Sequence, residues 1–346
     1  MKLNNHLYVA VLAGITLFTA ACSKGSKEDP SEKVQTDVYV AGYEQKVGAS
    51  TAIVWKNGVP SRITENISLV NAQSIFVKGD DVYVAGWDIP SGRTLAKVWK
   101  NGAPIALSDK LSNAYSVFVY GNDVYVAGHE YDLYMTRHVA KVWKNGVASS
   151  LTTGREDAYL MSMFVTERDE YAAGYEYNGT RFVAKLWKNH IATILSTSTR
   201  PTYAYSVFIS GSDRYVVGAE RNGAINIAKA WKNGGEITLT DGSKNAEARA
   251  AYISGNDFYA AGFESNGTKD VAKIWKNGIA TSLTDGTNNA QVHAIFVLGD
   301  DVYAAGYESN GRYEVAKIWK NGVATSLSDG TSQMFVTAMY VVQSEK

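Results

Sequence analysis

Beyond the first 22 residues, apolar residues occur in short runs separated by polar turn residues, without helical spacing. The stretch 294–327 shows the pattern most clearly, with runs at 294–297, 302–308, 315–320 and 323–327. These runs are rich in Val, Ile, Tyr, Phe, Trp and Thr, and Gly, Asn or Asp bounds them. Runs of this length and composition predict β-strands. The stretch therefore predicts four short strands joined by tight turns.

This four-strand pattern is one copy of a tandem repeat with a period of 44 residues. Its most constant feature is Trp-Lys-Asn, followed by Gly in all copies but one, and the tryptophans are Trp55, Trp99, Trp143, Trp187, Trp231, Trp275 and Trp319. A four-stranded sheet of this size cannot bury its faces alone, so it must stack on copies of itself. Seven such units match the blades of a β-propeller. We therefore predict an all-β fold, a seven-bladed β-propeller of four-stranded antiparallel blades spanning 36–342.

The Asn-Gly pair after each Trp-Lys predicts a two-residue hairpin turn. A type I′ turn needs positive φ at both central residues, which Asn and Gly tolerate. The fourth copy has Asn189 followed by His190 instead, and we expect a looser turn there.

The phase of the repeat predicts how the ring closes. The first copy begins at 37–42, which corresponds to a second strand, and the last copy ends at 338–341, which corresponds to a first strand. Seven complete blades result if the C-terminal strand pairs with the three N-terminal strands, which leaves no blade with a missing strand. We therefore predict non-covalent closure of the ring by the two ends of the repeat region.

The N-terminal segment has the features of a targeting signal. A positively charged start precedes an apolar run, 7–18, that is too short to span a membrane. Small residues then lead to a cysteine in the order Thr19-Ala-Ala-Cys22. This junction resembles the lipobox of bacterial lipoproteins, although an aliphatic residue is usual where Thr19 stands. The resemblance implies cleavage before Cys22 and lipidation of that cysteine. Ordinary signal cleavage just before it is the alternative.

The sequence thus predicts four segments: a signal peptide (1–21), a lipidated Cys22 with a flexible polar tether (22–35), the propeller (36–342) and a short tail (343–346). The chain as a whole resembles a bacterial lipoprotein built on a repeat-type propeller. That resemblance implies a lipid-anchored protein of the bacterial cell envelope, at the outer membrane or the cell surface. Cys22 is the only cysteine, which excludes an intrachain disulfide.

The charge balance excludes two classes of partner. Lys and Arg together number 34, as do Asp and Glu, so the formal net charge is zero. There is no basic excess for nucleic acid and no Lys/Arg run for an anionic membrane surface. We expect a monomer that contacts the membrane only through its lipid anchor and has no nucleic-acid partner.

Residues present in every copy are most simply required by the blade itself. The repeat tryptophans belong to this group, and we expect them to pack between blades rather than to form a ring of ligand-stacking side chains. A lysine stands two positions before the tryptophan in six copies, and an acidic residue follows the second strand in all seven. We expect these to form ion pairs, worth typically under ~1 kcal/mol each when exposed. The alternative is an acidic ring that binds cations or a basic partner.

Positions that differ between copies are better candidates for a site. The residue before the small residue of the first strand is in turn Gln73, Tyr115, Met161, Tyr205, Arg249, His293 and Thr337. Two residues earlier stand Asn71, Asn113, Tyr159, Tyr203, Glu247, Gln291 and Phe335. If the first strand is innermost, both sets surround one mouth of the central channel, with the polar and aromatic mixture typical of ligand sites. The alternative is random divergence at solvent-exposed strand starts.

From these positions we predict the ligand-binding residues Gln73, Tyr115, Tyr205, Arg249 and His293. The five histidines are scattered singly, and the sequence has no metal-binding cluster, nucleophile elbow or phosphate-binding loop. We therefore expect no cofactor, no metal and no catalytic residue.

The predicted function is a non-catalytic envelope module that binds a glycan, a peptide or a protein at the channel mouth. One alternative is an envelope lyase or hydrolase acting on polysaccharide or peptide, with His293 and Arg249 in acid–base roles. Another is a structural protein whose repeated blades bind multivalently.

Overall fold

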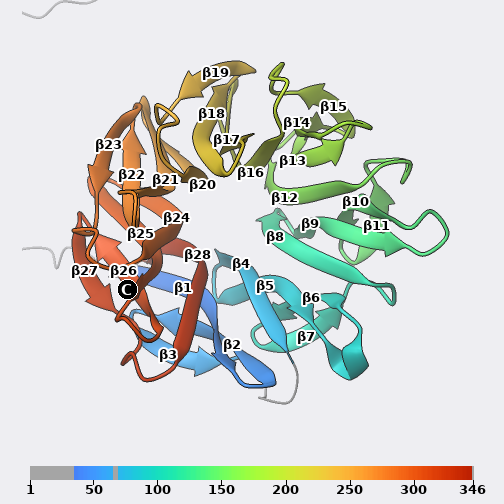
Figure 1. The fold of residues 1–346 in the computed structure, drawn as a ribbon. Coiled ribbons are helices and arrows are strands. Elements are labelled where there is room, and N and C mark those ends of the chain that lie inside the picture. The colour runs from blue at the N-terminus through green and yellow to red at the C-terminus, as the bar shows by residue number, and fades with distance from the viewer. Residues whose placement is uncertain (1–34, 65–68, 345–346) are drawn as a thin grey trace, which may run out of the picture.

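The structure is a computed structural model that describes residues 35–64 and 69–344. The predicted signal peptide, Cys22 and the tether up to residue 34 lie outside the described residues. The described residues form seven four-stranded antiparallel sheets. Figure 1 shows that these sheets are arranged as a ring. Within the described residues the single helical element is a 3-10 turn, Pro90–Gly92. The predicted all-β, seven-bladed propeller is therefore confirmed.

Each blade contains four strands in sequence order, apart from the blade that joins the two ends of the chain. That blade contains β28 (Gln333–Ser344), β1 (Gln35–Lys46), β2 (Ala49–Lys56) and β3 (Val59–Arg62). The second contains β4 (Val70–Lys78), β5 (Asp81–Asp88), β6 (Leu95–Lys100) and β7 (Ala103–Ala106). The third contains β8 (Ser112–Tyr120), β9 (Asp123–Asp132), β10 (Arg137–Lys144) and β11 (Val147–Ser150). The fourth contains β12 (Ala158–Val165), β13 (Glu170–Tyr177), β14 (Phe182–Lys188) and β15 (Ile191–Ile194). The fifth contains β16 (Thr202–Ser210), β17 (Asp213–Asn222), β18 (Ile225–Lys232) and β19 (Gly235–Thr238). The sixth contains β20 (Ala246–Ser254), β21 (Asp257–Ser265), β22 (Asp270–Lys276) and β23 (Ile279–Ser282). The seventh contains β24 (Ala290–Leu298), β25 (Asp301–Ser309), β26 (Glu314–Lys320) and β27 (Val323–Ser326).

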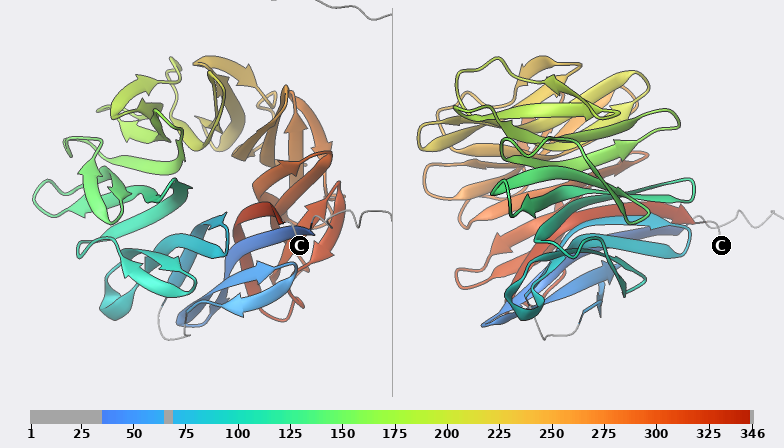
Figure 2. Two further views of the ribbon diagram at one scale, coloured as in Figure 1. Left: turned by 180° about the vertical axis from the view of Figure 1, so that it is seen from behind. Right: turned by 90° about the vertical axis from the view of Figure 1, so that its right-hand side faces the viewer.

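The ring closes where β28 pairs antiparallel with β1. The pairing extends from Gln35 opposite Ser344 to Gln45 opposite Gln333. It supplies the first strand of a blade whose other strands are β1, β2 and β3. Closure by the C-terminal strand, as the phase of the repeat predicts, is therefore confirmed. Figure 2 shows the ring edge-on, with β28 ending at one of its two faces.

The first strand of each blade is innermost (Figure 1). The innermost strands are β28, β4, β8, β12, β16, β20 and β24, and each contacts the corresponding strand of both neighbouring blades. The premise on which the predicted channel-mouth site rests is therefore correct.

Seven hydrophobic clusters join the blades, and each contains one repeat tryptophan. Trp99 of the second blade, for example, packs with Tyr39, Ala41 and Val54 of the first. The seven tryptophans are at most 3% exposed. An aromatic side chain of this size removes about 150–250 Å² from water, which contributes roughly 4–6 kcal/mol. Packing between blades, as predicted, accounts for the repetition of tryptophan.

The Lys and Asn that follow each tryptophan hold the start of the second strand. In the first blade Asn57 Oδ1 accepts a hydrogen bond from Val38 N (2.8 Å), and Asn57 Nδ2 donates to Asp37 Oδ1 (2.7 Å). Lys56 Nζ pairs with Asp37 Oδ2 at 2.9 Å and lies over the Tyr39 ring. The bonds from Asn57 and Lys56 lower the pKa of Asp37. Equivalent contacts recur in the other six blades.

The predicted lysine–carboxylate pairs form within the blades. Five of the six lysines pair with the acid that follows the second strand: Lys97 with Asp88, Lys141 with Glu130, Lys185 with Glu176, Lys273 with Glu264 and Lys317 with Glu308. Lys229 pairs with Glu236 instead. These acids are therefore already paired in the folded protein.

The turn at Asn189 and His190 is as tight as the others, so the expectation of a looser turn was wrong. The two residues have φ values of 47° and 69°, and Lys188 still pairs directly with Ile191. Asn189 also keeps the bonds that hold the equivalent asparagines, to Glu170 N and Asp169 Oδ1. These bonds and the strand register fix the turn, and His190 adopts the left-handed conformation that Gly has elsewhere.

A β-bulge interrupts the first strand of every blade at its most divergent position. In the second blade Ala72 pairs with Gly86 and Ser74 pairs with Ala85, so Gln73 is the extra residue. The extra residues of the seven blades are Gln73, Tyr115, Met161, Tyr205, Arg249, His293 and Thr337. A bulge bends its strand and re-aims the side chain of the extra residue.

A glycine in the second strand makes each bulge possible. A Cβ added to Gly86 would lie 1.9 Å from the carbonyl oxygen of Asn71. The equivalent glycines are Gly42, Gly128, Gly174, Gly218, Gly262 and Gly306, and a Cβ on any of them would lie 1.9–2.0 Å from a carbonyl oxygen. Only glycine allows the first strand to approach this closely.

Replacing Gly218 with Ala should destabilise the protein by about 3 kcal/mol or more, because the new Cβ would lie 1.9 Å from Tyr203 O and force β16 away from β17. Denaturant unfolding of the variant and the wild type measures the difference. Gly235→Ala in the same blade is the matched control, since its Cβ would meet only Lys232 O, at 3.3 Å. The control should lose less than about 1 kcal/mol. Similar losses in both variants would contradict this account of the bulge.

Candidate functional site at the channel mouth

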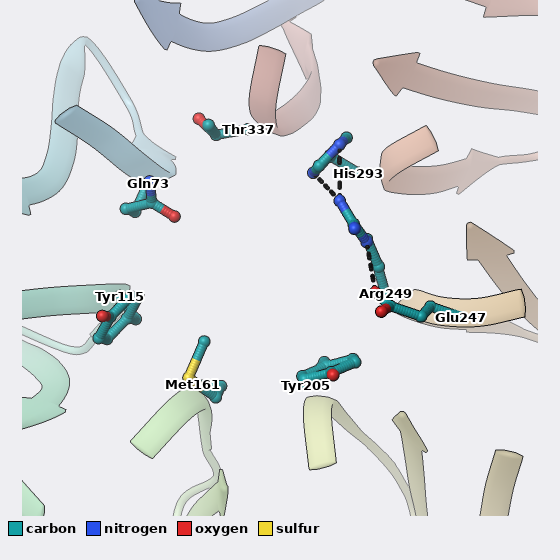
Figure 3. A pocket seen from close by; sticks show the side chains of 8 residues that line it. All are labelled: Gln73, Tyr115, Met161, Tyr205, Glu247, Arg249, His293 and Thr337. Atoms are coloured by element: carbon teal, nitrogen blue, oxygen red, sulfur yellow. Dashed lines mark hydrogen bonds and ion pairs between the residues drawn. The ribbon is translucent and has the colours of Figure 1, made fainter. Parts of the chain in front are cut away.

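The seven bulged residues meet at one cavity in the mouth of the central channel. The cavity has a volume of about 360 Å³ and is lined by Gln73, Tyr115, Met161, Tyr205, Glu247, Arg249, His293 and Thr337. Figure 3 shows these side chains surrounding a common space. Its volume lies at the lower end of the range for ligand pockets, about 300–1,000 Å³. The five residues predicted to bind a ligand are therefore brought together, while their binding role stays a prediction.

The second divergent position contributes less to the mouth than we expected. Of its seven residues only Glu247 lines the cavity. Others contact the residue that follows the bulge glycine in the next strand: Tyr159 packs against Tyr175 with ring centroids 5.1 Å apart, and Gln291 accepts a hydrogen bond from Tyr307. These residues brace the mouth from outside rather than line it.

One side of the cavity is polar. Arg249 Nε donates to Glu247 Oε2 at 3.0 Å, and Arg249 Nη1 lies 3.0 Å from His293 Nε2. Asn226 Nδ2 donates to the other oxygen of Glu247 at 2.7 Å. The guanidinium group also lies over the Phe263 ring, 5.2 Å from its centroid. The arginine and the glutamate are therefore a fixed ion pair with no net charge.

His293 is neutral in this arrangement. A guanidinium group can only donate hydrogen bonds, so the facing ring nitrogen must accept one. Burial and the charge of Arg249 lower the pKa of His293 well below its usual value of 6.5. A histidine with so low a pKa is a weak base near neutral pH. The geometry therefore does not favour the acid–base pair of His293 and Arg249.

The other side of the cavity is aromatic and apolar, and it is formed by Tyr115, Met161 and Tyr205. The Tyr115 ring is braced by Trp87, with centroids 5.2 Å apart. Tyr205 is stacked on Tyr203 at 6.3 Å with an interplanar angle of 12°. Burial raises the pKa of Tyr115 to about 12 and also raises that of Tyr205. Both hydroxyls therefore stay protonated at neutral pH.

Deeper along the innermost strands lies a closed ring of seven aromatic side chains, which we did not predict from the sequence. It consists of Phe76, Phe118, Phe164, Phe208, Tyr252, Phe296 and Tyr340. Centroids of neighbouring rings are 4.6–5.5 Å apart. Each member stands three residues after the bulged residue of its blade. The signal was an aromatic residue at this position in every copy.

A second cavity, of about 240 Å³, lies in the third blade beside the aromatic side of the mouth and contains two histidines. The His129 and His138 rings meet edge to face with centroids 4.9 Å apart. His138 Nδ1 lies 3.0 Å from Asp157 Oδ1. His129 is only 5% exposed, its Nδ1 has no hydrogen-bond partner, and burial lowers its pKa to about 3. The fold thus pairs two histidines that are scattered in the sequence.

Within residues 35–64 and 69–344, no group of three or more His, Cys, Asp or Glu side chains could hold a metal ion. Within the same residues, no helix has the length and apolar character needed to cross a membrane.

Comparison with known proteins identifies the fold. No family model and no curated protein matches the chain. Among solved structures, an acylaminoacyl peptidase from Pyrococcus horikoshii is similar with a TM-score of 0.52 and 11% identity, over 85% of this chain and 50% of the peptidase chain. The β-propeller domain of the Trilobed protease from Pyrococcus furiosus is similar with a TM-score of 0.55 and 9% identity, over 86% and 93%.

These similarities show the propeller fold alone. The present chain spans about half the length of the Pyrococcus horikoshii peptidase. The Trilobed protease domain is described as having an open velcro topology. In the present chain, by contrast, β28 pairs with β1 and closes the ring.

Acid should destabilise the propeller because His129 is buried in its neutral form. Burial holds its folded-state pKa at about 3, whereas an unfolded histidine titrates near ~6.5, so the unfolded chain binds the proton first as the pH falls. The stability contributed by the neutral imidazole of His129 is complete above about pH 6.5 and is lost toward pH 3. The loss should approach about 1.4 kcal/mol per pH unit. Urea unfolding at several pH values between 7.5 and 4 measures this slope.

The control for this pH dependence is the His129→Phe variant, which keeps an aromatic ring and removes the titrating group. Five other blades carry Tyr, Trp or Phe at this position. The variant should show a shallower dependence of the unfolding free energy on pH, with the contribution of His293 remaining. An unchanged slope would contradict the assignment to His129.

Proposed function

We propose that the protein is a non-catalytic binding module whose ligand occupies the channel-mouth cavity. The observation that carries the proposal is that the positions that differ most between copies are the bulged positions that line one cavity. Their mixture of aromatic and polar side chains is the one that ligand pockets use. Residues repeated in every copy are instead engaged in contacts within or between blades.

We propose a non-catalytic role because His293 is poorly suited to acid–base catalysis in this cavity. The pKa of His293 is lowered, and its ring accepts a hydrogen bond from Arg249. The similar structures named as a peptidase and a protease domain share only the fold. Their names nevertheless make peptides worth testing beside glycans and proteins.

A multivalent role for the repeated surface has less support. The polar side chains that recur at the surface of every blade are those of Lys56, Asn57 and their counterparts, and they are already bonded to Asp37 and its counterparts. A ligand that bound each blade through these groups would have to break the same contacts seven times. The mouth cavity, by contrast, has two tyrosine hydroxyls without a bond to the described protein.

We also propose that the protein is anchored in the bacterial envelope, at the outer membrane or the cell surface, by a lipid on Cys22. The resemblance of 19–22 to a lipobox supports the anchor. The register of β1 supports an orientation: Gln35 lies at one end of the strand, and Gly42, at the level of the bulge, lies about 20 Å further along. By this register, a tether that ends at Gln35 would join the ring at the face opposite the mouth. The mouth would then point away from the membrane.

Alanine at Tyr115 or at Arg249 should weaken ligand binding at least tenfold, about 1.4 kcal/mol, because each substitution removes one side of the cavity. The ligand is found by screening the purified protein against arrays of envelope glycans and peptides, with product analysis of every hit. Tyr120→Ala is the matched control, since Tyr120 stands at the other end of the same strand and is 41% exposed. It should bind like the wild type.

Two outcomes of this experiment count against the proposal. Binding that survives both substitutions would place the ligand elsewhere on the protein. Turnover of a bound ligand would show that the module is an enzyme.

Replacing Cys22 with Ser should move the protein from the membrane fraction to the soluble fraction, because the lipid would lose its attachment thiol. Cell fractionation followed by mass spectrometry of the mature N-terminus measures both location and modification. The wild-type protein is the control and should carry a lipid at Cys22. A serine variant that remains in the membrane fraction would rule out lipidation as the anchor.

A further inference from the structure

We infer that the ligand of the mouth cavity is a neutral saccharide, an inference that rests on the proposed binding function and specifies its ligand. Three properties of the cavity carry it: its charge, its apolar faces and its uncommitted hydrogen-bonding groups. Each property excludes a different kind of small ligand.

The cavity has no net charge to offer a ligand. Arg249 and Glu247 are the only ionised residues among those that line it, and they are bonded to each other. Asn226 donates a hydrogen bond to the second carboxylate oxygen of Glu247, which fixes the position of the carboxylate. His293 is neutral. An anionic or cationic ligand would lose hydration without meeting an unpaired opposite charge, which is unfavourable. This property favours a neutral ligand.

The apolar faces come from rigid rings. The Tyr115 ring contacts Trp87, with centroids 5.2 Å apart, and His129, with centroids 5.7 Å apart. Tyr205 is held by Tyr203. Tyrosine rings provide a large contact area at a low cost in conformational entropy. A pyranose ring has an apolar face of C–H groups that can pack flat on such a ring. Met161, between the two tyrosines in Figure 3, extends this apolar side.

The remaining hydrogen-bonding groups include both donors and acceptors. Gln73 Nε2 donates to Asn71, which leaves the Gln73 carbonyl oxygen as an acceptor facing the cavity (Figure 3). Among the described residues, Arg249 Nη2 and the hydroxyls of Tyr115 and Tyr205 have no partner. Thr337 offers less, because its hydroxyl donates to Ala72 O at 2.8 Å.

A sugar hydroxyl matches this mixed set because it donates and accepts at once. A carboxylate or a phosphate would only accept, and a hydrocarbon would do neither. The polar side of the cavity faces the aromatic side across the same space (Figure 3). One sugar ring could therefore stack on a tyrosine while its hydroxyls bond to Gln73 and Arg249.

Trp87 provides a direct signal for such stacking. The seven repeat tryptophans are at most 3% exposed between the blades. The eighth, Trp87, is half-buried and contacts the Tyr115 ring edge-on at 5.2 Å. A ligand that packs on Tyr115 should change the fluorescence of Trp87 and leave that of the buried tryptophans unchanged.

The test titrates the purified protein with neutral hexoses, N-acetylhexosamines and their short oligomers, followed by calorimetry and by tryptophan fluorescence. Uronic acids and short neutral peptides form the comparison arms. We expect a neutral saccharide to bind with a fluorescence change. Tyr205→Ala should weaken that binding at least tenfold, and Tyr205→Phe should stay within about fivefold, because the phenyl ring keeps the stacking face. Trp87→Phe should remove the fluorescence change.

The outcomes separate this inference from the proposed function. If no neutral saccharide binds, or if only uronic acids or peptides do, the saccharide assignment is wrong. A peptide that binds in a manner sensitive to Tyr205→Ala would still support the mouth as a binding site. If a saccharide binds equally well to Tyr205→Ala and the wild type, both the saccharide site and the proposed location of binding are wrong.

Discussion

A Cβ on the glycine opposite each bulge would lie 1.9–2.0 Å from a carbonyl oxygen of the innermost strand. This close approach, possible only for glycine, lets the innermost strand carry one extra residue in every blade. The extra residue is redirected into the channel mouth, while the strand on either side of it stays paired with the second strand, in a register shifted by one residue. The shape of the ring and the position of the candidate site therefore depend on the same seven backbone contacts.

Because of the bulge, the residues that pack the blades together are different from those that line the cavity. Blade packing uses the repeat tryptophans and the small residues beside the bulge, such as Ala72, Ala204 and Ala248, which are fully buried. The extra residue contributes little to that packing, so its side chain can differ from blade to blade at little cost in stability. Seven nearly identical blades can thus surround a cavity with a polar side at Arg249 and an aromatic side at Tyr115 and Tyr205.

The fold could be predicted from the sequence because the 44-residue repeat indicates the strands, the turns and the way in which the ring closes. The divergent position also led to the residues of the mouth, since difference among otherwise similar copies singles them out. The bulge itself did not follow, because it depends on a contact between two strands that spacing in one strand does not reveal. The turn at His190 was misjudged because the bonds of Asn189 outweigh the preference for glycine. The pairing of His129 with His138 depends on register between β9 and β10, which single positions do not encode.

The stoichiometry of ligand binding tests the central claim most directly. The claim is that differences among the blades create one site, because the seven bulged side chains, which are of six kinds, combine only at the channel mouth. Native mass spectrometry of the protein with its ligand, supported by calorimetry, counts the ligands bound by each chain. The account predicts one ligand per ring at saturation. Several equivalent ligands per ring would contradict it and would assign binding to the features that all blades share.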